Sequence, residues 1–86
     1  MTKKELFEFI SSSVYVCSDI YTDGRNKMED RIYSKGGQFY LIKYCNSHPT
    51  CDPKPVNKRT FVIKKEVTAY EDENGLGIHI EREIPE

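Results

Sequence analysis

Residues 30–44 contain two stretches rich in β-branched and aromatic residues, separated by the glycine pair Gly36-Gly37. Glycine readily adopts the positive φ angles of a two-residue hairpin turn, so this stretch predicts a β-hairpin. The turn sets the cross-strand pairs: Ile32–Leu41, Ser34–Phe39, Tyr33–Tyr40 and Asp30–Lys43. A hairpin of this length requires a sheet to pack in, which makes an antiparallel sheet the expected framework of the chain.

Two further stretches are expected to add strands. Residues 14–21 alternate, with Val14, Val16 and Ile20 on one side and Tyr15, Cys17 and Tyr21 on the other, and the turn-forming residues 22–26 follow. Residues 60–70 and 76–84 flank an acidic, glycine-containing turn and predict a second hairpin. Residues 46–57 contain three prolines and are expected to form a loop or an extended crossing.

The register of this second hairpin can be predicted from its apolar residues. A four-residue loop, Asp72 to Gly75, merges the apolar sides of the two strands on one face. The predicted pairs are Ala69–Ile78, Val67–Ile80, Ile63–Ile84, Thr68–His79 and Glu66–Glu81. The repulsion between the two glutamates costs about 0.2–1 kcal/mol, less than the exposure of several aliphatic side chains after a one-residue slip.

The N-terminal residues predict a short helix. Thr2 and Glu5 match the capping-box pattern, and Leu6, Phe9 and Ile10 recur with helical spacing up to an end near Ser12. We expect this helix to cover the sheet face formed by Ile32, Phe39 and Leu41. The predicted fold class is α+β: a short N-terminal helix packed on a four- or five-stranded antiparallel sheet, a meander of hairpins.

Length and composition indicate one small domain spanning residues 1–86. The longest apolar runs reach four residues, as at 39–42, far below the roughly 20 that a membrane span needs. The N-terminus lacks the apolar stretch of a secretory signal, which predicts a cytoplasmic location without membrane association. An odd number of cysteines, three, favours free thiols over disulfides.

The segment 45–51, CNSHPTC, is the strongest metal candidate in the sequence. Cys45, His48 and Cys51 offer three zinc ligands in one loop, and Cys17 is the candidate fourth. The spacing matches no zinc ribbon or finger, so an ordinary polar loop is the preferred interpretation and zinc the minority one. We expect no cofactor.

The same loop could be read as a cysteine nucleophile beside a histidine base. Adjacent residues on an extended loop rarely hold that geometry, and no glycine-rich oxyanion loop is evident. The sequence therefore predicts a protein that is not an enzyme.

Charge is distributed unevenly although the net charge is −1. Residues 24–65 carry ten Lys and Arg against three acids, a net of +7, whereas residues 71–86 carry six acids against Arg82, a net of −5. We favour mutual neutralisation of neighbouring strands over a basic binding face. Nucleic-acid binding, with or without zinc at Cys45, His48 and Cys51, is the alternative function, because tyrosines interleave with Arg31, Lys35 and Lys43.

The preferred functional prediction is a protein-binding module. One short helix cannot cover both faces of the sheet, so an aromatic face should remain exposed as an interface. The predicted binding residues are Tyr33, Tyr40, Ile42, Tyr44, Arg31 and Lys43. Self-association through that face or through an unpaired edge strand, giving a homodimer, would fit the same pattern. Size and irregular character suggest an inhibitor or accessory protein of a phage or mobile element.

Overall fold

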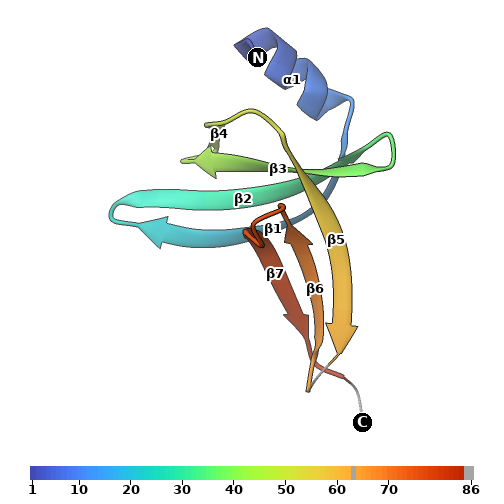
Figure 1. Ribbon diagram of the computed structural model, residues 1–86. Coiled ribbons are helices and arrows are strands. Elements are labelled where there is room, and N and C mark those ends of the chain that lie inside the picture. Colours follow the sequence, from blue (N-terminus) through green and yellow to red (C-terminus); the bar gives the residue numbers. More distant parts are fainter. Residues whose placement is uncertain (63, 85–86) are drawn as a thin grey trace.

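The computed structural model describes residues 1–62 and 64–84 (Figure 1). One helix, α1 (Lys3–Ser11), precedes the strands. Seven strands follow within these described residues: β1 (Val14–Asp23), β2 (Asn26–Lys35), β3 (Gln38–Cys45), β4 (His48–Pro49), β5 (Lys54–Val62), β6 (Glu66–Glu71) and β7 (Gly77–Arg82). The coarse prediction of an antiparallel sheet with one short helix is confirmed, although there are more strands than the four or five expected.

The helix begins where the capping box places it. The Glu5 amide donates to the Thr2 hydroxyl over 3.2 Å, and the Glu5 carboxylate accepts from the Thr2 amide over 3.2 Å. These two bonds satisfy donors that a helix N-terminus leaves unpaired. At the other end, the Ser12 hydroxyl donates to the carbonyl of Glu8 over 2.9 Å, which ends the helix within one residue of the predicted position.

The first three strands form two consecutive tight hairpins. The loop Gly36-Gly37 joins β2 to β3, and every predicted pair is observed: Ile32–Leu41, Tyr33–Tyr40, Ser34–Phe39 and Asp30–Lys43. The residues 22–26, predicted as a turn, close β1 on β2, with Asp23 opposite Asn26. A bulge at Val16 shifts the β1 register, so the strict alternation predicted for residues 14–21 is wrong: Tyr15 pairs with Tyr33, whereas Cys17 pairs with Ile32.

The region 46–57, predicted as a loop or an extended crossing, contains strand structure. β5 begins at Lys54, pairs first with β3 through Val56 opposite Phe39, and then continues as the partner of β6. Pro55 fits here because its carbonyl can still accept although it has no amide proton to donate. The predicted single strand over residues 60–70 is also wrong: β5 ends at Val62 and β6 returns antiparallel from Glu66.

The β6–β7 register differs from the prediction by one residue. Tyr70 pairs with Ile78, Thr68 with Ile80, and Ala69 with His79, so the two predicted glutamates do not face each other and Glu66 lies opposite Arg82. The turn is longer than predicted because the Asp72 carboxylate accepts from the amides of Asn74 and Leu76 over 2.8 and 2.9 Å, which includes Leu76 in the loop. The predicted Ile63–Ile84 pair lies outside the described residues.

The strands join in the order β1-β2-β3-β5-β6-β7, with β4 paired to β3, and the sheet curls nearly into a barrel. In Figure 1, β6 and β7 cross the direction of β1 to β3. The concave side, which we call the core face, holds one apolar cluster: Ile32, Leu41, Val56, Tyr70 and Ile78. The opposite side of β2 and β3, which we call the helix face, packs against Leu6 of α1.

This arrangement reverses the predicted position of the helix. The expectation that α1 covers Ile32, Phe39 and Leu41 is wrong, because the curled sheet places β6 and β7 over those residues instead. The prediction treated the sheet as flat. In a flat sheet the C-terminal strands lie beside β1 to β3, so only the helix is left to cover a face, whereas in the twisted sheet these strands cover one face and the helix the other. With nine residues, α1 is too short to cross a bilayer, and the described residues contain no other candidate span.

Candidate functional site

The tyrosine face predicted as an open interface lies beneath α1. Tyr33, Ile42 and Tyr44 are buried against Leu6, and no more than 4% of any of the three is exposed. Tyr40 is half-buried and makes an edge-to-face contact with Phe9, with ring centroids 5.0 Å apart. The expectation that these side chains are exposed is therefore wrong. The reason is that the C-terminal strands β6 and β7 cover the core face, so the helix packs on the opposite face, which holds the tyrosines.

Arg31 and two tyrosines form a polar network inside this helix face. The Tyr33 and Tyr44 hydroxyls lie 2.8 Å apart, Arg31 donates to the Tyr33 hydroxyl over 3.3 Å, and its guanidinium lies 4.0 Å from the Tyr44 ring centroid. The Glu29 carboxylate, 2.9 Å from the guanidinium, raises the pKa of Arg31. Burial and the Tyr33 hydroxyl raise the pKa of Tyr44. These contacts hold the helix face together rather than present it to a partner.

Strand pairing fixes the positions of the cysteine and histidine residues of the predicted metal loop. Cys45 and His48 flank a two-residue turn, and the Cys51 sulfur accepts from the Lys43 amide over 3.3 Å. Cys17 lies on the core face, where burial raises the pKa of its thiol although the Tyr70 hydroxyl acts in the opposite sense. Among residues 1–62 and 64–84, no group of three or more His, Cys, Asp or Glu side chains is arranged to hold a metal ion.

The basic stretch is paired with the acidic one, as we favoured. The Lys54 ammonium contacts the Asp72 carboxylate, and Arg59 lies 3.2 Å from Glu71. Glu71 also lies 3.0 Å from the His79 ring. With Lys65, which lies 3.5 Å from both Glu81 and Glu83, three of the ten basic residues are paired with acids of the C-terminal segment. Lys43, a predicted binding residue, is exposed and lies opposite Asp30.

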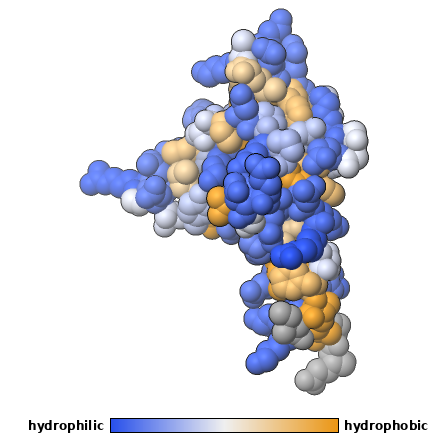
Figure 2. Space-filling model, in the orientation of Figure 1, coloured by the Kyte–Doolittle hydropathy of each residue, from blue (hydrophilic) through white to orange (hydrophobic). Residues whose placement is uncertain are grey.

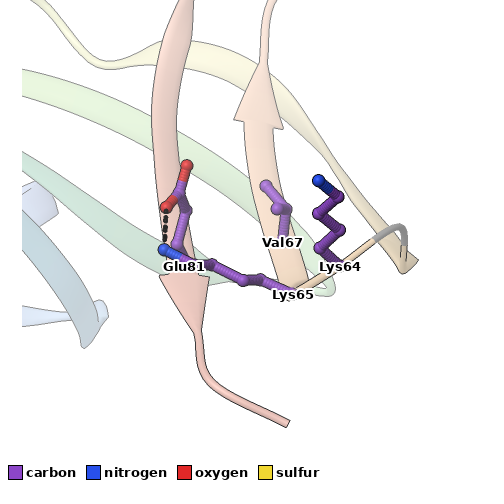
Figure 3. A pocket seen from close by; sticks show the side chains of 4 residues that line it. All are labelled: Lys64, Lys65, Val67 and Glu81. Carbon is purple, nitrogen blue, oxygen red and sulfur yellow. Dashed lines mark ion pairs between the residues drawn. The ribbon is translucent and has the colours of Figure 1, made fainter.

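The surface has shallow hollows, one of which is shown in Figure 3. It has a volume of about 270 Å³ and lies where β6 begins and β5 and β7 end. Lys65 reaches across it to within 3.5 Å of Glu81, while Val67 and the stem of Lys64 line the remainder. Its charged groups are exposed side chains, and no buried polar residue lies among the described residues, so the hollow provides no enclosed set of ligand contacts.

The outer edge of β1 is the surface that the fold leaves most open. β1 pairs with β2 on one side, and no described strand pairs with its other side. It spans ten residues, and its exposed large apolar side chains are Val14, Tyr15, Val16, Ile20 and Tyr21. In Figure 1 the β1–β2 hairpin extends away from the remaining strands, and Figure 2 shows hydrophobic atoms on this projection behind a hydrophilic tip.

Edge strands normally carry features that prevent pairing with other chains, such as lysine, proline, bulges or a short length. Residues 14–23 contain no lysine, arginine or proline, and the bulge at Val16 leaves seven regularly paired residues, 17–23, beyond it. The opposite edge strand, β7, is shorter, and its charged residues Glu81 and Arg82 are exposed. The missing lysines could have been read from the sequence, and they are the signal that the prediction did not use.

Comparison with models of known protein families, with curated proteins and with solved structures finds no match, so the function has to be argued from geometry.

Proposed function

We propose that the protein is a protein-binding module that accepts an extended segment of its partner at the outer edge of β1. The observation that carries this proposal is a long edge strand with exposed apolar side chains, no lysine, arginine or proline, and seven regularly paired residues beyond its bulge. Strand addition supplies main-chain hydrogen bonds for affinity and side-chain contacts for selectivity. An inhibitor or accessory factor that acts by direct contact would work in this way.

The hydrogen-bonding groups that a partner would use follow from the hairpin register. The pair that closes a two-residue loop exchanges two hydrogen bonds, and such pairs then alternate along the strands. Since Asp23 and Asn26 close the loop, Tyr21 and Asp19 also bond to β2. The amides and carbonyls of Ser18, Ile20 and Thr22 consequently point outward. The Ile20 side chain, 56% exposed, lies next to them.

Nucleic-acid binding is supported less by the contacts. The tyrosines that could stack on bases are buried or half-buried under α1, and basic side chains such as Lys54 and Arg59 are paired with acids. Binding to nucleic acid would weaken steeply with salt concentration and would not depend on Ile20. That difference separates the two proposals.

Site-specific photo-crosslinking in the host cell tests the proposed function. A crosslinking residue replaces Ile20, and a matched control replaces Leu76, another apolar side chain that is 65% exposed. We expect a discrete protein adduct from position 20 that is lost when Ser18 is changed to proline, because proline removes an outward amide. An identical adduct pattern from both positions, or one that survives Ser18→Pro, would contradict the proposal. Circular dichroism shows whether the proline variant is folded.

A further inference from the structure

The two sides of β1 differ in chemistry, and this difference selects a type of partner. Beyond the bulge, Cys17, Asp19, Tyr21 and Asp23 share the core face, whereas Ser18, Ile20 and Thr22 share the helix face. The core-face side is acidic. The helix-face side offers an aliphatic side chain between two small hydroxyl residues.

The acidic side of β1 is reinforced by the next strand. Asp30 of β2 pairs with Asp19, and the Tyr21 hydroxyl donates to the Asp30 carboxylate over 3.4 Å. The core-face positions 26–32 of β2 add no basic side chain, and Lys43 of β3 lies opposite Asp30. Three carboxylates thus flank Tyr21. Two lysines lie on the same side of the sheet: Lys43 opposite Asp30, and Lys58 of β5, whose charge acts on Cys17.

The charges on neighbouring groups agree with this geometry. Burial, together with Asp30, Asp19 and Asp23, raises the pKa of Tyr21. Burial and Asp19 also raise the pKa of Asp30, while Lys43 and the Tyr21 hydroxyl act in the opposite sense. Lys43 offsets part of the charge on Asp30, whereas Asp19 and Asp23 form no ion pair with any described residue.

We infer that the segment accepted at β1 is a basic, amphipathic strand in which lysine or arginine alternates with aliphatic residues. This inference rests on the proposed function. A strand added beside residues 18–22 places alternate side chains on the two sides of the sheet. Its basic residues lie beside Asp19 and Asp23, and its aliphatic residues lie beside Ile20. A second copy of β1 fits less well, since it would add two more aspartates to the same edge.

Synthetic peptides test the inference directly. The probe is an eight-residue peptide of alternating lysine and valine with blocked ends, and its matched control carries glutamate in place of lysine. Fluorescence anisotropy measures binding at about 0.15 M salt, where long-range attraction is screened. We expect the lysine peptide to bind roughly tenfold more tightly than the glutamate peptide, and Asp19→Asn with Asp23→Asn to weaken it roughly three- to tenfold.

Two further variants show that binding occurs by strand addition. Ile20→Pro removes an outward amide and should abolish binding, while Ile20→Ala keeps that amide and should retain part of it. If Ile20→Pro does not fold, a lysine peptide N-methylated on the edge that faces β1 replaces it, and this peptide should not bind. Backbone amide exchange of Ser18, Ile20 and Thr22 should slow when the unmodified lysine peptide is added.

The remaining outcomes overturn the inference. Equal binding of the lysine and glutamate peptides, or no effect of the two asparagine substitutions, would show that charge does not select the segment, while the edge itself would still be in use. Absence of binding by any peptide would reject a basic strand as the occupant. A dimer in sedimentation that Ile20→Pro dissociates would identify a second copy as the occupant. The crosslinking at position 20 decides separately whether the edge binds a protein.

Discussion

Tyr44 has a buried ring, and its hydroxyl forms a hydrogen bond with another tyrosine hydroxyl. Its hydroxyl lies 2.8 Å from that of Tyr33, and the Arg31 guanidinium lies over its ring. Only 4% of the residue is exposed. The sequence indicated an aromatic, basic combination at these positions, and that combination is present. The sequence could not show that these side chains bond to one another beneath the helix instead of facing solvent, because this depends on which face the helix covers.

The raised pKa of Tyr44 predicts a specific loss of stability at alkaline pH. An unfolded tyrosine titrates near pH ~10, so the contribution of Tyr44 is fully present below that pH and is lost as the pH rises through its higher folded-state pKa. We expect Tyr44→Phe to cost about 1–2 kcal/mol at pH 8, since the Tyr33 hydroxyl loses a partner. Urea unfolding at several pH values above 9 should show a shallower alkaline decline in this variant.

The matched control for this prediction is Tyr15→Phe. Tyr15 is 52% exposed, and its hydroxyl lies 2.8 Å from that of Ser18 at the surface. The control should keep the alkaline decline of the wild-type protein. A Tyr44→Phe variant with an unchanged decline would show that Tyr44 does not couple folding to alkaline pH.

At the scale of elements, the hairpins differ in how far the sequence determines them. Gly36-Gly37 and the turn at 22–26 permit tight loops, and the predicted β2–β3 pairs are all observed. The β6–β7 hairpin was predicted with the wrong register because apolar matching favoured a four-residue loop. The local bonds from the Asn74 and Leu76 amides to Asp72 define a longer turn instead. Side-chain bonding within a turn thus outweighed the apolar pattern of the strands.

Gly77 is the residue that this longer turn requires. A Cβ atom at position 77 would lie 1.8 Å from the Tyr70 carbonyl oxygen and 3.1 Å from the Glu71 Cα, so the backbone of β6 would have to move. We expect Gly77→Ala to destabilise the fold by about 3 kcal/mol or more, measured by chemical unfolding. The matched control is Gly24→Asn, at a positive φ in open space, which should cost less than about 1 kcal/mol. Similar losses for both variants would argue against the close contact.

At the scale of the whole molecule, β5 connects the two parts of the sheet. Its first residues pair with β3 and its later residues with β6, so the same strand belongs to both parts. The sequence did not reveal this role, because three prolines in residues 46–57 indicated a loop or an extended crossing rather than a paired strand. Non-local pairing of a proline-containing strand depends on tertiary packing rather than on local propensity.

Val56 lies at the point where β5 passes from one partner to the other. It is 1% exposed, lies opposite Phe39 of β3, and packs in the cluster that contains Tyr70 of β6 and Ile78 of β7. Because that cluster is shared, we expect the two parts of the sheet to unfold together. Val56→Ala should cost about 2 kcal/mol, from the lost methyl groups and the space they leave.

Native-state hydrogen exchange distinguishes shared from separate unfolding. In Val56→Ala, the slowest amides of β2 and β3 and those of β6 and β7 should lose the same protection, since all of them exchange through one global opening. Val62→Ala on the same strand is the control: Val62 is 61% exposed, and its truncation should change protection little. If only the β6–β7 amides lose protection, that hairpin opens independently of β1 to β3. The curled sheet would then consist of two units that β5 links without coupling their stability.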